Sequence, residues 1–377
     1  MPGHSPESDE TLSMISQAAA DFAKPDAQRR RTIRNSSDGF DRTIWSDMAG
    51  QGWLGVLVPE AAGGIGLGVE AAARIAERVG YACFTEPFVE VAVLAARCVA
   101  LCPDSPERSR LLGGICSGAL VVALAWQGPG GRLRPGDAAV DAIENGDHVR
   151  LDGEARFVVP SRADTFVLAA LMNGKLALLT VSADTRGLSI QHEKSADGCT
   201  SARIAFADVT IPASQVLVGS DAETIVGTAL EESTLCTAAE LLGLIDRSIE
   251  ITQSYLGTRK QFGQSIGSFQ VLQHRMVDIW MQKELTRAAL MSALKVFVSE
   301  GTSMDERRAA ASNAKARASQ AALIIAGQSL QMHGAIGFSD EYELGIYVNR
   351  SLVLAARHGN AAFHRRRYGD LVHVRER

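Results

Sequence analysis

Apolar side chains recur along the chain with two different periods, and the period changes twice. From about residue 9 to 118, stretches such as "ETLSMISQAAADFA" and "GVEAAARIAERVG" repeat apolar residues every three or four positions, as amphipathic helices do. Between about 119 and 218 the apolar runs are short and β-rich, as in "ALVVALAW" and "SARIAFADVTI". The helical period then returns, with long amphipathic runs at 222–257, 270–299 and 304–333.

This order predicts an α+β fold with three segments along the chain. The expected segments are an N-terminal all-α domain (1–118), a β-sheet domain (119–218) and a C-terminal helical-bundle domain (219–377). Within the middle segment, Asn145-Gly146 and Asn173-Gly174 each lie between strand-like runs and predict hairpins with type I′ turns. We therefore expect the sheet to be antiparallel.

The stretch "VLVPEAAGGIGLGVEAAARIAERVG" (Val56 to Gly80) has the order of a strand, a glycine turn and a helix. In a Rossmann domain the G-x-G-x-x-G turn lets a dinucleotide pyrophosphate approach the helix N-terminus. Here the last interval between glycines is one residue too short, and no second strand and helix pair follows, because the strands are confined to the middle third. We expect the glycine cluster to be a structural turn.

Composition narrows the possible classes of protein. With 46% hydrophobic and 21% charged residues the chain is typical of globular proteins, and a net charge of -5 gives no general attraction to nucleic acid or to an anionic membrane. The six cysteines form no C-x-x-C pair, so neither a zinc knuckle nor a disulfide framework is indicated. The N-terminus has no apolar core and no run of about 18 apolar residues occurs, which predicts a cytoplasmic protein that does not span a membrane.

Three motifs in chain order resemble those of the acyl-CoA dehydrogenase family. The segment "TRKQFGQSIGSFQVLQHRMVDI" (Thr258 to Ile279) resembles the family's R-x-x-F-G-x-x-I-x-x-F-Q segment. The segment "LQMHGAIGFSDEYELGIYVNR" (Leu330 to Arg350) resembles its Q-x-x-G-G-x-G-F segment, with Ala335 at the second glycine. The early "WLGVLVPEAAGGIGLG" resembles its P-E-x-x-G-G-x-G turn. The resemblance implies an N-terminal helical domain, a small antiparallel β domain and a C-terminal four-helix bundle.

The same resemblance implies FAD as the cofactor, and Arg259 has the forked cation that suits its pyrophosphate. The strand "LDGEARFVVPSRAD" resembles the one that lies against the flavin ring, which places Phe157 and Val159 at flavin-facing positions. Apolar residues in such segments can equally be core residues, and Phe157 can be an ordinary sheet aromatic. The remaining implied contacts are those of the FAD adenosine and pyrophosphate across a subunit interface (Arg259, Gln261, Phe262, Ile266, Phe269, Gln270) and those of close backbone approach (Gln331, Gly334, Gly337).

The family's chemistry needs a carboxylate that removes an α-proton, and the sequence leaves three sources for it open. Most members carry it in an E-G-T segment, but the matching stretch here has His358-Gly359-Asn360 and no acidic residue. Other members carry it in an E-R pair on the helix before R-x-x-F-G, where Glu232 lies one residue from the matching position and Thr234 replaces the arginine. The base is then Glu232, or His358, or a residue of a different, base-bearing subunit.

A second departure lies in "LAWQGPGGRLRPGD" (Leu124 to Asp137), which resembles the family's T-E-P-x-x-G-S-D segment near the flavin but has no glutamate and no serine. Both departures resemble the smaller subunits of two-gene acyl-CoA dehydrogenases, which act on bulky or carboxylated acyl chains. The resemblance thus implies FAD-dependent α,β-dehydrogenation of an acyl-CoA, with electrons passed to an electron-transfer flavoprotein, in a homo- or hetero-tetramer. The alternative is a non-catalytic partner that completes the FAD site of a sister subunit.

Overall fold

The computed structural model describes residues 6–36 and 39–373, and the chain divides into two compact units. One unit, here the helical unit, consists of residues 1–32, 69–84 and 234–377. The other, here the sheet unit, consists of residues 33–68 and 85–233. Each unit has its own buried apolar core. The three-domain division expected from the sequence stays a prediction.

The described residues up to 118 are mostly helical, as predicted. Local capping starts two of the helices: the Asp41 carboxylate accepts a hydrogen bond from the Thr43 backbone N–H, and the Ser105 hydroxyl accepts one from the Arg108 N–H. The elements of this segment are α1 (Pro6–Phe22), α2 (Ala27–Arg34), α3 (Arg42–Gly50), η1 (Trp53–Gly55), η2 (Glu60–Ala62), α4 (Gly68–Tyr81), η3 (Val89–Ala95), α5 (Ala96–Leu101) and α6 (Pro106–Cys116).

The glycine cluster is a turn, as expected, but the strand that seemed to precede it is absent. Val56 and Val58 are fully buried in the connection between the short helices η1 and η2. Gly64 packs so closely on this connection that an added Cβ would lie 2.1 Å from the Val58 carbonyl oxygen. A short apolar run looks the same in sequence whether it is a strand or a buried turn, which is why the strand prediction was wrong.

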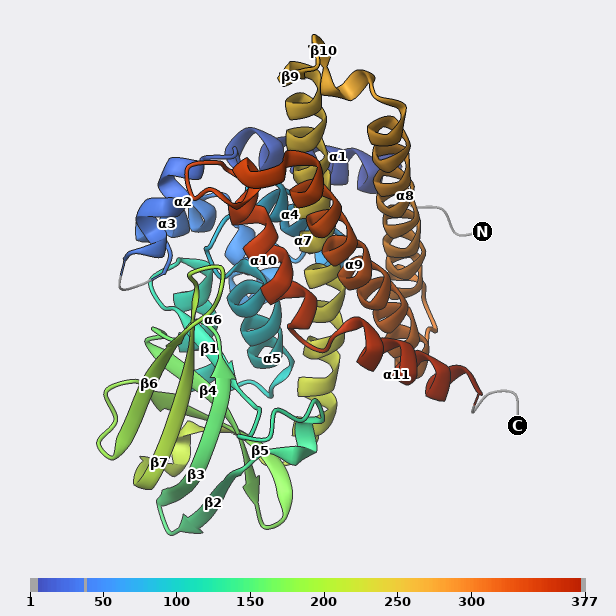
Figure 1. The fold of residues 1–377 in the computed structure, drawn as a ribbon. Coiled ribbons are helices and arrows are strands. Elements are labelled where there is room, and N and C mark those ends of the chain that lie inside the picture. Colours follow the sequence, from blue (N-terminus) through green and yellow to red (C-terminus); the bar gives the residue numbers. More distant parts are fainter. Residues whose placement is uncertain (1–5, 37–38, 374–377) are drawn as a thin grey trace. The chain divides into compact units, whose positions relative to one another are not determined.

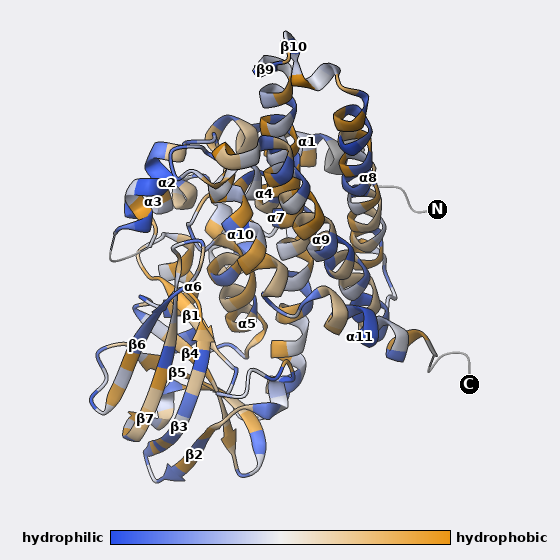
Figure 2. Ribbon diagram, viewed as in Figure 1, coloured by the Kyte–Doolittle hydropathy of each residue, from blue (hydrophilic) through white to orange (hydrophobic). Residues whose placement is uncertain are grey.

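Among the described residues, eight strands form one sheet in the order β6-β7-β3-β2-β4-β5-β8, with β1 beside β4. Most neighbours are antiparallel, as predicted, but β4 pairs in parallel with both β1 and β2. Strand β1 is buried and apolar along its whole length (Figure 2). The strands are β1 (Val122–Ala125), β2 (Val140–Asn145), β3 (His148–Val158), β4 (Thr165–Met172), β5 (Lys175–Ser182), β6 (Leu188–Lys194), β7 (Thr200–Pro212) and β8 (Val216–Val218).

Both predicted hairpins form, but only one has the expected turn. Asn173 and Gly174 connect β4 to β5 with φ of 53° and 74°, and a positive φ at both positions is the mark of a type I′ turn. In the other hairpin Asn145 pairs with His148, so the two loop residues are Gly146 and Asp147, and of these only Gly146 has a positive φ. The register of β2 against β3 therefore moves this turn by one residue.

The C-terminal part is a bundle of long helices, which confirms the runs expected from the helical period (Figure 1). Helix α9 packs against α8, α10 and α11, and a capping box between Ser303 and Glu306 starts it. A small hairpin joins α7 to α8. The elements are α7 (Ala222–Thr258), β9 (Lys260–Gln261), β10 (Gln264–Ser265), η6 (Ile266–Ser268), α8 (Gln270–Val298), α9 (Met304–His333), η7 (Gly334–Phe338), α10 (Leu344–Ala356) and α11 (Ala361–His373).

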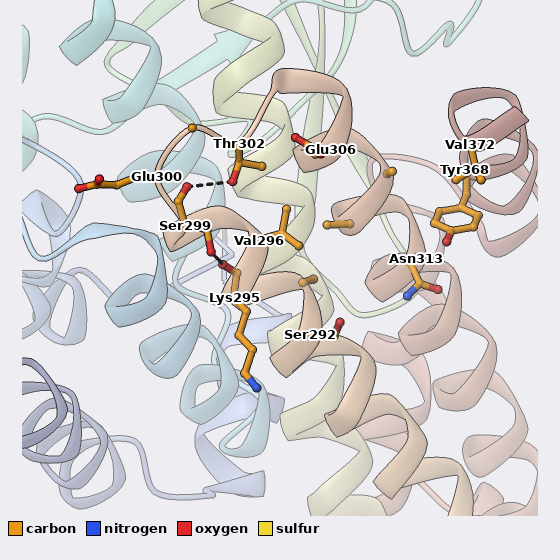
Figure 3. Close-up of a pocket in the computed structure, with 14 residues that line it drawn as sticks. Ser292, Lys295, Val296, Ser299, Glu300, Thr302, Glu306, Asn313, Tyr368 and Val372 are labelled. Carbon is orange, nitrogen blue, oxygen red and sulfur yellow. Dashed lines mark hydrogen bonds between the residues drawn. The ribbon is translucent and has the colours of Figure 1, made fainter. Parts of the chain in front are cut away.

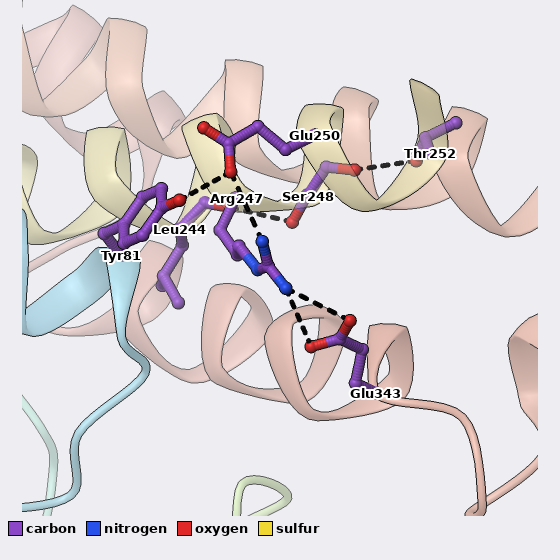
Figure 4. A network of polar contacts seen from close by, with 7 residues as sticks. All are labelled: Tyr81, Leu244, Arg247, Ser248, Glu250, Thr252 and Glu343. Atoms are coloured by element: carbon purple, nitrogen blue, oxygen red, sulfur yellow. Dashed lines mark hydrogen bonds and ion pairs between the residues drawn. The ribbon is translucent and has the colours of Figure 1, made fainter. Parts of the chain in front are cut away.

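An ionic network in the helical unit joins α7 to α4 and to the start of α10 (Figure 4). The guanidinium of Arg247 pairs with Glu343 at 3.2 Å and with Glu250 at 3.4 Å. The Tyr81 hydroxyl donates to the same Glu250 carboxylate at 2.6 Å. This network ties α7 to its neighbours at residues 247–250, in the last third of the helix.

No helix within residues 6–36 and 39–373 is both long enough and apolar enough to cross a membrane.

Candidate functional site

In the sheet unit, Phe157 has the features of a ligand-facing aromatic. Phe157 is 44% exposed, and its φ of 60° lies in a backbone region that bulky residues rarely adopt. The Arg156 guanidinium stacks over its ring, 5.0 Å from the centroid. Its neighbour Val158 is buried and Val159 is half-buried. Exposure at a strained backbone conformation favours the flavin-facing alternative over an ordinary sheet aromatic, and the assignment stays a prediction.

The loop that departs from the family pattern, 124–137, lies against this aromatic. The Arg156 N–H donates to the Gln127 carbonyl oxygen at 2.8 Å, and a Cβ added to Gly131 would lie 3.2 Å from the Phe157 ring. The structure therefore brings together two segments that the sequence analysis assigned separately to the flavin. Both belong to the same compact unit.

In the helical unit, the hairpin after α7 presents the predicted Arg259 segment to solvent. Phe262 is 91% exposed, with a φ of 52°, so the core-packing alternative is wrong for this residue. Its ring meets that of Phe269 edge to face, with centroids 6.0 Å apart. Arg259, Gln261 and Gln270 are exposed, whereas Ile266 and Phe269 are half-buried. Within the described part of the chain the Arg259 guanidinium has no hydrogen-bond or ion-pair partner.

The ends of α7 and α9 meet beside this hairpin. The Tyr255 ring stacks on the His333 ring with centroids 4.4 Å apart, and its hydroxyl donates to the His333 carbonyl oxygen at 3.4 Å. Gln331 on α9 and Gly334 at the start of η7 are exposed, and Gly337 on η7 is buried. Gly334 has a φ of 65° and ψ of -143°, which only glycine adopts readily, and a Cβ there would meet no atom within 4 Å. The backbone at Gly334 is thus open to a ligand.

Two buried polar atoms near the end of α9 have no partner among the described residues. His333 is 4% exposed; its Nδ1 donates to the Ser329 carbonyl oxygen at 2.7 Å, which leaves Nε2 as an acceptor with no donor. The Ser329 hydroxyl is likewise buried and unpaired. Burial also lowers the pKa of His333, so the neutral ring is favoured. Because buried polar atoms are normally hydrogen-bonded, such atoms are expected where a ligand or water completes the site.

The candidate base Glu232 lies on α7, in the part of that helix that belongs to the sheet unit. It is 5% exposed, and its Oε2 lies 2.9 Å from Nε of Arg97 on α5. The sequence analysis missed Arg97. The available signal was a single arginine within the otherwise apolar run "VEVAVLAARCVALC". A charge in such a helix must either reach solvent or find a partner.

The other candidate base, His358, lies in the turn between α10 and α11. Burial, together with the nearby cations of Arg357 and Lys315, lowers the pKa of His358 to about 3. Its carbonyl oxygen accepts a hydrogen bond from His364 Nε2 at 3.0 Å. Its φ of 56° is one that non-glycine residues seldom adopt. A side chain with so low a pKa is a poor general base near neutral pH.

The helical unit also contains a groove of about 560 Å³, away from the Arg259 hairpin (Figure 3). Its walls come from the end of α8, the start of α9 and α11, and include Lys295, Asn313 and Tyr368. The Arg259 hairpin precedes the opposite end of α8, about 40 Å away along a helix of this length. None of the residues expected to contact the cofactor lines the groove.

Comparison with known proteins identifies the family. The description "Acyl-CoA dehydrogenase, N-terminal domain" matches residues 9–119, and "Acyl-CoA dehydrogenase, C-terminal domain" matches residues 223–372. The chain belongs to the acyl-CoA dehydrogenase family, a family of FAD-dependent oxidoreductases. Membership of this family confirms the expected fold, class of enzyme and cofactor.

Three relatives show the range of proteins that the chain is similar to. "Probable acyl-CoA dehydrogenase YngJ" of Bacillus subtilis is 26% identical over 343 residues, which are 87% of this chain and 89% of that protein. "Caffeyl-CoA reductase-Etf complex subunit CarC" of Acetobacterium woodii is 25% identical over 354 residues, 88% and 90% of the two chains. The solved structure of a variant of the "Tcur3481-Tcur3483 steroid ACAD" is 29% identical, with a TM-score of 0.85 over 97% of this chain and 98% of that one.

The described residues fit FAD. Arg259 offers a guanidinium without a protein partner, Phe157 and Phe262 offer exposed rings, and the backbone at Gly334 is open. The unpaired atoms of Ser329 and His333 add hydrogen-bonding capacity next to the Gln331 to Gly337 segment. These features lie partly in the sheet unit and partly in the helical unit. The assignment of each residue to a part of the cofactor stays a prediction.

Proposed function

We propose that this chain dehydrogenates an acyl-CoA thioester between its α- and β-carbons and passes the electrons to an electron-transfer flavoprotein. The observation that carries the proposal is the buried Glu232 carboxylate on α7, paired with Arg97. Removal of an α-proton requires a general base, and a positioned carboxylate can serve as one. The similarity to the subunit named "Caffeyl-CoA reductase-Etf complex subunit CarC" supports an electron-transfer flavoprotein as the partner.

In this proposal Glu232 takes the α-proton of the acyl-CoA onto its carboxylate. Bound FAD supplies the acceptor for the hydride that leaves the β-carbon. Arg259 holds the pyrophosphate of the cofactor with a charge-assisted fork, and Phe157 packs at the flavin. The exposed amide of Gln331 and the open backbone at Gly334 bind the rest of the dinucleotide.

The geometry favours Glu232 over His358 as the base. A pKa of about 3 leaves the His358 ring neutral at physiological pH but too weakly basic to take a proton from carbon efficiently. The cations of Arg357 and Lys315 also oppose a positive charge on the His358 ring. We therefore propose His358 as a structural residue of the turn between α10 and α11.

The second candidate function is a subunit whose FAD site is completed by a base-bearing partner. It is favoured by the turn at His358 to Asn360, where the sequence matches the family's carboxylate segment but carries no acid. The similar solved structure carries a pair of names, "Tcur3481-Tcur3483", and the words "steroid ACAD". These names support a hetero-tetramer that acts on a bulky acyl chain such as a steroid side chain. By contrast, the relative YngJ carries the name of a single protein. A cytoplasmic location remains part of the proposal.

The test is Glu232→Gln in the FAD-loaded protein, purified together with any partner encoded by a neighbouring gene. Stopped-flow bleaching of the flavin by acyl-CoA thioesters should slow by about 10²- to 10⁴-fold, because a positioned base contributes that much. Glu231→Gln is the matched control, since Glu231 is an adjacent, equally buried carboxylate. His358→Ala should leave the rate of flavin reduction unchanged.

An unchanged rate for Glu232→Gln within an active hetero-oligomer would place the base on the partner chain. A protein that is colourless alone and becomes yellow only when co-expressed with its partner would favour the second candidate function.

A further inference from the structure

Arg97 is the charged group that the structure sets against the candidate base. Its Nε lies 2.9 Å from Glu232 Oε2, with 26% of the Arg97 side chain and 7% of the Glu232 side chain exposed. No other ion pair or hydrogen bond of the Arg97 side chain occurs in residues 6–36 and 39–373. Within the described residues, Glu232 is therefore the carboxylate with which this guanidinium pairs.

The helix that carries Arg97 is held firmly from the other side. Helix α5 continues directly from η3, a π-helical segment in which all seven residues are buried. Segment η3 packs against β1 and against the short helix η1, all in the sheet unit. A π-helical turn is rare, is often found at functional sites, and rotates the residues that follow it relative to a continuous α-helix. The direction of Arg97 is thus set by buried packing.

An ion pair in such surroundings acts strongly on the carboxylate. A carboxylate must be ionised before it can accept a proton, and a cation about 3 Å away favours the ionised form of an acid. Loss of one partner from a buried pair leaves the other charge without compensation. Glu231 is the neighbour of Glu232 in sequence on α7 and is also buried. The Cys98 thiol on α5 interacts electrostatically with both charges of the pair and with Cys102, which directly follows α5. Burial raises the pKa of both thiols, so they stay uncharged near neutral pH.

We propose that Arg97 is a positioning residue for Glu232, fixing the place of the carboxylate and holding it ready to accept the α-proton. The inference rests on the proposed function of Glu232 and adds to it a residue from a different helix. Arg97 acts through Glu232 and does not itself take part in proton transfer. Its loss should therefore have no further effect once Glu232 has been neutralised.

The experiment compares Arg97→Gln, Glu232→Gln and the double variant as FAD-loaded proteins. The probes are butyryl-, octanoyl-, palmitoyl- and pimeloyl-CoA and the CoA thioester of a steroid side-chain acid, and the readout is the rate of flavin reduction from pH 5 to 9. Arg97→Gln should slow reduction by about 10- to 100-fold and move the acid limb of the pH profile to higher pH by about one unit or more. In the Glu232→Gln background the same substitution should change the rate less than about twofold, because coupled residues are not additive.

Two further variants separate positioning from general damage to the fold. Arg97→Lys keeps the charge and should restore the acid limb while recovering only part of the rate. Arg110→Gln breaks a 2.7 Å ion pair with Glu107 on α6, in the same unit, and should leave both rate and profile unchanged.

The inference would be overturned if the rate losses of Arg97→Gln and Glu232→Gln multiplied in the double variant. It would also be overturned if the acid limb of the pH profile did not move in Arg97→Gln. Wild-type reduction rates in Glu232→Gln would instead overturn the assignment of Glu232 as the base and place the base on a partner chain. A slow Glu232→Gln variant beside a normal Arg97→Gln variant would leave the proposed function standing and overturn only the function assigned to Arg97.

Discussion

At the scale of single residues, the predicted functional residues include both an exposed charge and a largely buried ion pair. The Arg259 guanidinium is exposed between the end of α7 and β9, where nothing in the described chain neutralises it. Glu232 and Arg97 form a largely buried pair inside the sheet unit. An exposed cation is available to bind an anionic ligand, whereas a buried pair mainly fixes geometry. We expect substitutions at the two places to have different effects.

Arg259→Ala should weaken FAD binding. A hydrogen bond to a charged group contributes about 1.5–3 kcal/mol, which corresponds to a roughly 10- to 100-fold higher dissociation constant. The measurement is fluorescence titration of the apoprotein with FAD, together with the flavin content of the purified protein. Lys260→Ala, which removes a neighbouring exposed charge without the fork, should bind FAD normally. Full flavin occupancy in Arg259→Ala would refute the assignment.

At the scale of elements, buried donors join α9 to the turn between α10 and α11. The Lys315 ammonium on α9 is completely buried and donates to the carbonyl oxygens of Gly359 at 3.0 Å and Ala355 at 3.3 Å. His364 on α11 donates to the His358 carbonyl oxygen and accepts from the Ser312 hydroxyl at 3.2 Å. Burial lowers the pKa of Lys315 to about 7 and that of His364 to about 3.

These shifts predict that the protein loses stability as the pH falls. Both folded-state pKa values lie below their unfolded values, so protons bind preferentially to the unfolded chain. The contribution of Lys315 is complete above pH 10.5 and is lost as the pH falls to about 7, whereas that of His364 is lost between pH 6.5 and about 3. Each proton adds a slope of up to about 1.4 kcal/mol per pH unit to the free energy of unfolding.

Urea unfolding measured from pH 4 to 10 tests this expectation. His364→Gln should flatten the dependence below pH 6.5, and Lys315→Met should flatten it above pH 7, although both variants lose hydrogen bonds and some stability. His148→Gln is the control, because the His148 side chain is half exposed on β3. A parent-like pH dependence in both buried-site variants would contradict the explanation.

At the scale of the whole molecule, helix α8 carries an exposed apolar stripe. Val277, Met281 and Leu285 recur every four residues, with Trp280 beside them, and all four residues are between 45% and 55% exposed. Such a stripe is typical of a face that another protein surface covers. It supports the expected oligomer, in which the Arg259 hairpin reaches the cofactor of a neighbouring subunit.

We expect the double substitution Trp280→Glu and Leu285→Glu to reduce the size of the assembly, because it places two charges in the proposed contact. Sedimentation velocity should show a species smaller than the wild-type oligomer, with a lower flavin content. Met14→Glu is the matched control, since Met14 is a 66% exposed apolar residue on α1. An unchanged sedimentation coefficient in the double variant, or a wild-type monomer that binds FAD tightly, would rule out this contact.

Local signals in the sequence were enough to predict much of the fold. The runs at 222–257, 270–299 and 304–333 became α7, α8 and α9 almost to the residue, because amphipathic period and capping act over one or two turns. The strand expected at Val56 to Val58 failed because a short apolar run does not distinguish a strand from a buried turn. The parallel pairing of β4 with β1 and β2 joins strands that are not neighbours in sequence, so no turn signal announces it.

The sequence by itself determined the order of helices and strands, the family and most of the residues expected to contact the cofactor, since these depend on neighbouring positions and on motifs. Tertiary structure decided which of those residues are exposed to a ligand or basic enough to accept a proton. It exposed Phe262, held Phe157 at a positive φ, and placed His358 where its pKa falls too low for a base. It also brought Arg97 to Glu232 across 135 positions of sequence, through the packing of η3 and α5. Burial and charge pairing depend on distances in space, which no local pattern of residues contains.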